Sequence, residues 1–88
     1  MDLSKPIELS PHAQEKMLDR GTSESEIEAA IRTGNPEPAR RGRLIMFRKN
    51  FAFNRPWRGK RYAVKQVAPV VAEEADRLVV VTVFVYYF

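Results

Sequence analysis

Two complete sets of helix-capping signals lie in the N-terminal part of the chain, and they limit the fold more than any other feature of the sequence. Ser10 is suited to cap a helix that begins at Pro11, because a proline at that position lacks only an N–H that would have no partner in the first turn. Gly21 is suited to end the same helix in the left-handed conformation. We therefore expect a helix from Pro11 to about Arg20.

A second helix is expected directly after the first. Ser23 and Glu26 have the spacing of a capping box, in which each side chain bonds the backbone N–H of the other residue. Apolar residues then recur at helical spacing at Ile27, Ala30 and Ile31. A Gly-Asn-Pro sequence at residues 34–36 ends the pattern. The helical part of the chain therefore consists of two short helices joined by a tight corner.

The apolar pattern after the helices is that of strands. Residues 44–53 and 61–71 are rich in β-formers, and residues 54–59 between them are typical of a turn. Pro69 is expected to disturb the pairing of its strand or to mark an edge. Residues 78–88 form the most apolar strand and are too few to cross a membrane as a helix.

The order of these elements predicts an α+β fold. We expect two N-terminal helices packed on one face of a three- to four-stranded antiparallel sheet, with neighbouring strands joined in a meander. Residues 7–9 either form a short strand or simply lead into the first helix. A chain of 88 residues has room for one modest core, so a single domain over residues 1–88 is expected, and a homo-oligomer or a tight partner would stabilise it.

Positive charge is concentrated in residues 40–65, here called the basic window. The window holds ten basic residues and no acidic one, whereas the rest of the chain holds five basic and all eleven acidic residues. Five aromatic residues are interleaved with these cations: Phe47, Phe51, Phe53, Trp57 and Tyr62. Cations neutralise phosphates and aromatic rings stack on unpaired bases, so the window favours RNA as partner.

The residues expected to contact nucleic acid are Arg41, Arg43, Arg48, Lys49, Arg55, Trp57, Arg58, Lys60, Tyr62 and Lys65. Two alternatives remain open for the same window. An acidic protein satisfies the same electrostatics. In the other alternative, the aromatic residues face the core and the cations only keep the opposite face soluble.

The only histidine, His12, falls at the second position of the first expected helix. Free N–H groups and the helix dipole disfavour an imidazolium there, so the ring is suited to act as a general base. Lys16 and Arg20 follow at spacings of four residues, which brings all three toward one side of the helix. The alternative is that His12 bonds a loop carbonyl, Lys16 is solvated, and Arg20 bonds the helix C-terminus or Asp19.

Several other classes of protein are disfavoured. One histidine and no cysteine give little basis for a transition-metal site, and the sequence has no glycine-rich phosphate loop, so no metal and no cofactor are expected. The N-terminus lacks the pattern of a secretory signal. A soluble, cytoplasmic protein without a membrane partner is therefore expected.

Residues 9–34 resemble a small bacterial family known as domain of unknown function 4258. The opening motif of that family runs Ser-x-His-Ala-x-x-Arg-Met-x-x-Arg-Gly, and the corresponding segment here is SPHAQEKMLDRG. The segment VVVTVF near the C-terminus resembles the closing strand of the family. The family is grouped with the RelE, ParE and BrnT-like toxins, which are small α+β domains. The resemblance implies a RelE-like domain, metal-independent cleavage of RNA and a small acidic antitoxin that covers the basic window.

The resemblance also implies roles for individual residues in an attack of a ribose 2′-OH on the adjacent phosphate. His12 would act as base or acid, Lys16 and Arg20 would contact the phosphate, and Arg61 would stabilise the transition state. Tyr62, Tyr86 or Tyr87 would donate a proton or stack on a base. Lys16 stands where the family has arginine, and it lacks the bidentate fork that matches phosphate. The alternative function is a non-catalytic RNA-binding or protein-binding module that uses the basic window.

Overall fold

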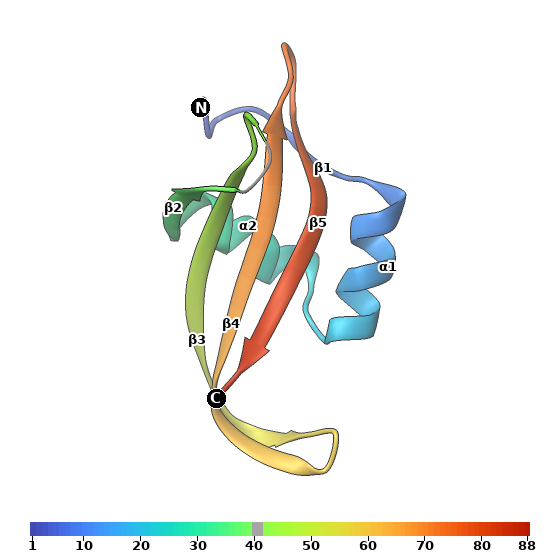
Figure 1. Cartoon of the computed structure of the whole chain (residues 1–88), viewed down its shortest axis with the longest axis vertical. Helices are drawn as coiled ribbons and strands as arrows, with labels where there is room; N and C mark the ends of the chain where they lie inside the picture. The colour runs from blue at the N-terminus through green and yellow to red at the C-terminus, as the bar shows by residue number, and fades with distance from the viewer. Residues whose placement is uncertain (40–41) are drawn as a thin grey trace.

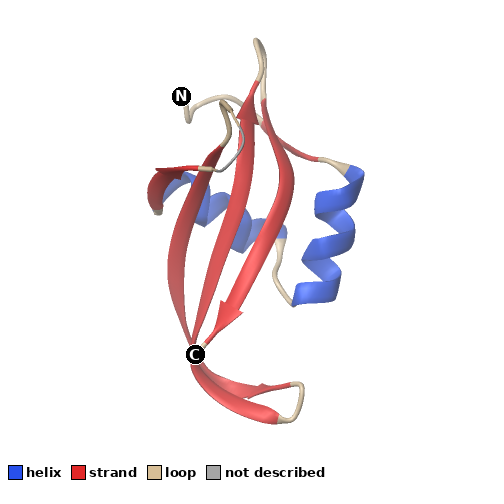
Figure 2. Cartoon of the chain, in the orientation of Figure 1, coloured by secondary structure: helices blue, strands red, loops and turns tan. Residues whose placement is uncertain are grey.

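A computed structural model describes residues 1–39 and 42–88 of the chain. A short strand comes first, two helices follow, and the other four strands come after them (Figures 1 and 2). The elements are β1 (Ile7–Leu9), α1 (Pro11–Arg20), α2 (Glu24–Thr33), β2 (Asn35–Pro38), β3 (Ile45–Trp57), β4 (Lys60–Glu73) and β5 (Leu78–Tyr87). The strands form one sheet in the order β1-β5-β4-β3-β2.

This sheet corrects the prediction of three to four antiparallel strands, because it has five strands and is mixed. β1 pairs parallel with β5, placing Ile7 opposite Leu78 and Leu9 opposite Val80. The other neighbouring strands are antiparallel. A three-residue strand has too little periodicity to be recognised along the chain, and only the contact with β5, some seventy residues later, makes it a strand.

β2 was not expected as a strand, because two of its four residues are prolines. It pairs antiparallel with the first part of β3, with Asn35 opposite Arg48 and Glu37 opposite Met46. Pro36 and Pro38 alternate with these residues, so the positions that lack an N–H face away from β3. The prolines are therefore compatible with an outer strand.

Both helices have the predicted boundaries and caps. Ser10 Oγ accepts a hydrogen bond from the Ala13 N–H, Ser23 Oγ accepts one from the Glu26 N–H, and Gly21 has a φ of 77°. α2 covers one face of the sheet, whereas α1 lies along the outer side of β5 (Figure 1). α1 nevertheless contributes Ala13 to the same core as Ile27 and Ile31 of α2. The fully buried side chains of the core include Ala13, Ile27, Ala30, Ile31, Val67, Val71, Leu78, Val80 and Val83.

β3 and β4 form a long hairpin that continues past the rest of the sheet (Figure 1). The pairing shifts between Ala52 and Arg55, where Asn54 has a φ of 50°, and this bulge bends the hairpin. The turn itself is limited to Arg58 and Gly59, so the turn predicted over residues 54–59 is shorter than expected. We call the hairpin end, residues 53–62, the basic arm.

Pro69 lies in the central strand β4 and is fully buried. Its expected effect on pairing is confirmed, because the pairing of β3 with β4 has a gap between Met46 opposite Val70 and Lys49 opposite Val67, although the register is the same on both sides of the gap. The alternative expectation, that Pro69 marks an edge, is wrong. On its other side Pro69 pairs with Val83 of β5.

Candidate nucleic-acid interface

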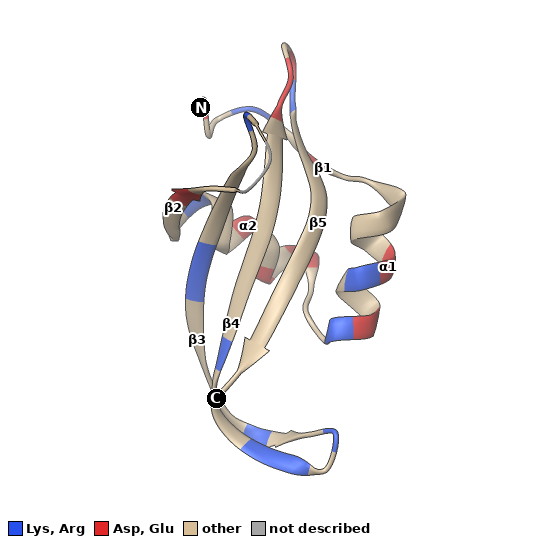
Figure 3. Cartoon of the chain, in the orientation of Figure 1, with Lys and Arg blue, Asp and Glu red and all other residues tan. Residues whose placement is uncertain are grey.

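The basic arm ends in a two-residue turn that the sequence is well suited to form. Arg58 and Gly59 both have positive φ, 50° and 83°, as in the hairpin turn whose twist matches that of the flanking strands. Four cations of the arm are exposed: Arg55, Arg58, Lys60 and Arg61. In Figure 3 this end of the molecule carries the blue of Lys and Arg and none of the red of Asp and Glu. The arm is therefore the most strongly positive part of the described chain.

Three of these cations lie over aromatic rings of the arm itself. The Arg55 guanidinium is 4.8 Å from the Phe53 ring centroid, that of Arg58 is 5.0 Å from Trp57, and the Lys60 ammonium is 5.7 Å from Tyr62. Such contacts hold flexible cations near a rigid surface without neutralising them. The positive charges are therefore presented on the outside of the arm, above a layer of rings.

The aromatic rings of the arm attach it to the body of the protein. Trp57 stacks on Tyr87 with centroids 5.0 Å apart and an interplanar angle of 17°, and Phe53 and Tyr62 also contact Tyr87, at 5.3 Å and 5.7 Å. Burial raises the pKa of Tyr87 above its ordinary value, and the charge of Glu26 acts in the same direction. Trp57 and Tyr62, expected to stack on bases, thus already contact an aromatic ring of the protein, and Trp57 is stacked on it.

The arm also contacts the C-terminal end of α1. Arg58 donates a hydrogen bond to the Asp19 carbonyl at 2.6 Å, and it lies 3.6 Å from the Asp19 carboxylate. The Tyr87 hydroxyl donates to the Arg20 carbonyl at 2.7 Å. A cation and a hydroxyl at these carbonyls favourably complement the negative end of the helix dipole. The arm is therefore held in place at both its base and its tip.

The four residues with implied catalytic roles are not gathered into one site. Arg20 donates to the Val83 carbonyl at 2.7 Å, with its guanidinium 5.0 Å from the Phe84 ring. His12 is exposed and eight residues earlier, about 12 Å along the helix axis. Lys16 is half-buried between them. Arg61 lies on the arm and donates to the Asn54 carbonyl at 2.9 Å.

Lys65 differs in environment from the other predicted nucleic-acid contacts, because it is only 4% exposed. Its ammonium pairs with the Glu26 carboxylate at 2.7 Å and donates to the Gly21 carbonyl at 3.1 Å. The Thr22 hydroxyl donates to the same Glu26 oxygen. Lys65 therefore joins β4 to the corner between α1 and α2, and it does not contribute to the outer charge.

Arg48 lies on the face of the sheet opposite α2. Its guanidinium donates to Glu37 at 2.6 Å and to Gln66 at 2.8 Å, and it lies 5.5 Å from the Tyr86 ring centroid. The hydrogen bond with Glu37 raises the pKa of Arg48 above its ordinary value. Arg48 is thus a charge already paired with a carboxylate, unlike the cations Arg55, Lys60 and Arg61 of the arm.

The remaining predicted contacts are dispersed. Lys49 is half-buried, with its ammonium 5.8 Å from the Phe51 ring centroid. Arg43 is exposed at the opposite end of β3 from the arm. Arg41 lies outside the described residues. The basic window of the sequence therefore divides into a compact arm and several separate cations.

A groove on the open face of the sheet was not predicted from the sequence. It has a volume of about 560 Å³, and its lining includes Met46, Val70, Thr82, Phe84 and Tyr86. A register shift in β5 moves Thr82, Phe84 and Tyr86 to this face, because Val70 pairs with Thr82 while the next residue pairs with Val80. The regular alternation of side chains between the two faces of a strand, applied to the sequence of β5, does not predict such a change of face.

The structure thus defines a small α+β domain with a mixed sheet, two N-terminal helices and a projecting cationic hairpin. A scan against protein-family models matches residues 9–85 to the family described as domain of unknown function (DUF4258), and the chain belongs to this family. Comparisons with curated proteins and with solved structures give no match. Within the described residues, no helix is long and apolar enough to span a membrane, and no cluster of side chains is arranged to hold a metal ion.

Proposed function

We propose that this protein binds RNA and that the basic arm is its principal contact. The observation that carries the proposal is the presence of four exposed cations on a ten-residue hairpin end that contains no acidic residue. Arg58 lies near the Asp19 carboxylate, whereas Arg55, Lys60 and Arg61 form no ion pair with a carboxylate of the described residues. Such positive charge on a projecting element is the electrostatic pattern of a phosphate-binding surface. The contacts of the arm with α1 and Tyr87 support a rigid placement of these charges.

The distribution of the cations favours a single strand over a duplex. Lys60 lies opposite Trp57 and Arg61 lies opposite Pro56, so these two consecutive cations project from the two faces of the hairpin. A flexible single strand can follow such a narrow arm with its phosphates. The preference for RNA over DNA rests on the family resemblance. The proposal includes a relationship of this chain to the RelE, ParE and BrnT-like toxins.

The salt dependence of binding tests the arm directly. A fluorescein-labelled oligouridylate is titrated with the protein at several salt concentrations, and anisotropy gives the binding constant. Contacts of four cations with phosphates predict a slope of log K against log salt of about −2.8, because each contact with a single strand contributes about 0.7. The double variant Lys60→Gln/Arg61→Gln is expected to reduce the slope to about −1.4 and to weaken binding at every salt concentration.

The double variant Lys5→Gln/Arg77→Gln is the matched control. It removes the same two residue types and the same charge, but from the other end of the molecule, where Lys5 pairs with Glu73 and Arg77 with Glu8. We expect this variant to bind like the wild type. Equal losses in the two double variants would show that only total charge matters, and they would refute the arm as the contact. Equal affinity for oligouridylate and oligothymidylate would refute the preference for RNA.

Cleavage of RNA is a second candidate function, and one observation in α1 favours it. Ser10, Ala13, Arg20 and Gly21 have structural roles in capping, core packing or contact with the strands. His12, in contrast, is exposed, and its imidazole is open to an RNA strand. A general base at that position would take the proton of a ribose 2′-OH as it attacks phosphorus, and the departing 5′ oxygen would receive a proton.

The cleavage test compares wild-type protein with His12→Ala and Lys16→Gln on total RNA. Products with a 2′,3′-cyclic phosphate and a free 5′-OH, formed equally in EDTA and in Mg²⁺, are expected if α1 carries this chemistry, and the His12 variant should lose them. Arg20→Ala is unsuitable here, because Arg20 also anchors α1 to the Val83 carbonyl. RNA left intact by the wild type in both conditions refutes cleavage and leaves the binding proposal to its own test.

A further inference from the structure

The two outer edges of the sheet are protected to very different degrees. On the β5 side, the Val81 carbonyl accepts a hydrogen bond from Ser10 Oγ at 3.1 Å and the Val83 carbonyl accepts one from Arg20 at 2.7 Å. On the other side, β2 covers β3 only from Ile45 to Arg48. β3 continues for nine residues beyond that point. Within the described residues, the outer edge of this later part of β3 has no neighbouring strand.

The register shows which backbone groups face this free edge. Val64 of β4 exchanges both of its backbone hydrogen bonds with Phe88, so it turns away from β3. Ala52 lies opposite Val64, and in an antiparallel pair both residues at such a position turn away from each other. The N–H and C=O of Ala52 therefore point outward. By alternation the same holds for Asn50, two residues earlier.

Asn50 and Ala52 thus offer two N–H and two C=O groups in a line that continues the ladder between β2 and β3. The free segment from Lys49 to Phe53 spans about 17 Å, since each residue of a strand advances about 3.4 Å. The outer edge of β2 itself is blunted by Pro36 and Pro38, but no proline follows in β3 until residue 56. The segment therefore has the geometry to pair with an added strand.

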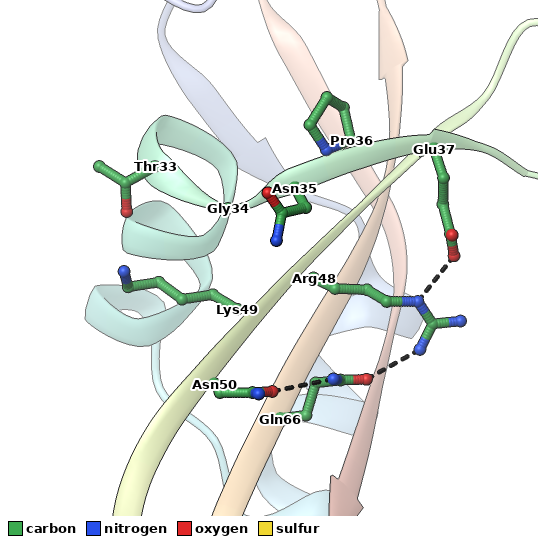
Figure 4. A pocket seen from close by; sticks show the side chains of 9 residues that line it. All are labelled: Thr33, Gly34, Asn35, Pro36, Glu37, Arg48, Lys49, Asn50 and Gln66. Atoms are coloured by element: carbon green, nitrogen blue, oxygen red, sulfur yellow. Dashed lines mark hydrogen bonds and ion pairs between the residues drawn. The ribbon is translucent and has the colours of Figure 1, made fainter.

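The charges around the free edge favour an acidic occupant. Figure 4 shows the lining of a polar cavity at the point where β2 begins after α2, with the side chains of Lys49 and Asn50 on opposite sides of β3. The cavity has a volume of about 350 Å³, and its lining includes Gln66 and also Glu37, whose carboxylate is already paired with Arg48. Among the described residues, no carboxylate forms an ion pair with Lys49. A carboxylate of an added strand would find this ammonium at the edge.

We propose that the free edge of β3, from Lys49 to Phe53, docks an extended acidic segment of a partner protein, which adds to the sheet as a further strand. A second copy of this chain is a poorer occupant, because residues 49–53 contain no carboxylate and would bring only a second Lys49 to the edge. This inference does not depend on RNA binding, since the exposed cations of the arm lie beyond the bulge at Asn54.

The first test uses the wild-type chain and a fluorescein-labelled heptapeptide of alternating Glu and Val. Amide exchange is followed by nuclear magnetic resonance. In the free protein, the Asn50 and Ala52 amides are expected to exchange faster than those of Lys49 and Phe51, which face β4. Saturation with the peptide is expected to slow exchange at Asn50 and Ala52 by at least about tenfold. Unchanged exchange at these two amides with the peptide bound overturns the proposal, as does a lack of binding at about 1 mM peptide.

The second test uses peptide and protein variants. We expect Ala52→Pro, which removes one outward N–H, to weaken binding by at least about tenfold, and Ala52→Thr, which keeps it, to bind like the wild type. A Lys-Val peptide should bind far more weakly than the Glu-Val peptide. Equal binding of the two peptides, or a dimer seen by ultracentrifugation that Ala52→Pro abolishes, overturns the acidic occupant. If Ala52→Pro weakens oligouridylate binding in place of peptide binding, the edge is an RNA site and the proposal is wrong.

Discussion

Replacement of Gly21 by alanine provides a demanding test of how the arm is held on α1. Gly21 has a φ of 77°, and a Cβ placed on it would lie 2.5 Å from Trp57 Cη2, 2.7 Å from Trp57 Cζ3 and 2.8 Å from Tyr87 Oη. Contacts this short cannot persist, so the rings have to move. The substitution therefore combines an unfavourable backbone conformation with displacement of the arm.

The magnitude follows from these two effects. A non-glycine residue in the left-handed region costs about 1–2 kcal/mol. Displacement of Trp57 weakens its stacking on Tyr87, about 0.5–1.5 kcal/mol, and movement of Tyr87 loses the hydrogen bond to the Arg20 carbonyl, about 0.5–1.5 kcal/mol. We therefore expect Gly21→Ala to lower the free energy of unfolding by about 2–5 kcal/mol, a large part of the stability of a domain this small.

Urea denaturation followed by tryptophan fluorescence measures this loss, because Trp57 is the only tryptophan and lies in the contact itself. Gly59→Ala is the matched control. Gly59 also has a positive φ, 83°, but nothing lies within 4 Å of a Cβ placed there. Gly59→Ala should lower the free energy of unfolding only by the cost of the left-handed backbone conformation, about 1–2 kcal/mol. If the two variants lose the same stability, or if Trp57 fluorescence of folded Gly21→Ala is unchanged, the proposed contact is wrong.

Three further predictions concern the contacts that join the helices to the sheet. Lys65→Met is expected to destabilise the fold by about 2–4 kcal/mol in urea denaturation, because it leaves Glu26 partly buried without its cation. The double variant with Glu26→Gln should recover part of this loss. Full additivity of the two single substitutions would contradict the pairing. Because burial raises the pKa of Tyr87 above its ordinary value of 10.0, its contribution to stability is complete below pH 10 and is lost as the pH rises through the raised pKa. Phenolate absorbance and unfolding measured against pH check this, and Tyr87→Phe should remove the corresponding step. Arg20→Ala should cost about 1–3 kcal/mol in thermal unfolding, since it leaves the Val83 carbonyl without its donor, and an unchanged midpoint would count against that role.

The helices illustrate what short-range rules can predict. Ser10, Pro11 and Gly21 act on backbone groups within one or two turns, so the bounds of α1 follow from nearby residues alone. The same is true of Ser23 and Glu26 for α2. The concentration of cations in one window is likewise a property of the sequence itself. These features were predictable because no distant partner decides them.

The site residues show the limit of those rules. Lys60 and Lys65 are equivalent in a count of charges, yet Lys60 is exposed on the arm and Lys65 is buried against Glu26. The difference depends on the packing of β4 against the corner between the helices, which brings together residues 39 positions apart. Similarly, the spacing of His12 and Arg20 on one helix does not disclose that Arg20 is engaged by β5.

The sequence by itself determined that this chain has two capped helices, strands after them and one strongly cationic segment, because capping, periodicity and composition act locally. Tertiary structure decided that the sheet is mixed, because β1 becomes a strand only beside Leu78–Val80. It also decided which face Phe84 occupies, through a register shift set by pairing with β4. All these features depend on contacts between segments that are distant in the sequence. The same is true of the shortness of β2, which leaves part of the β3 edge free.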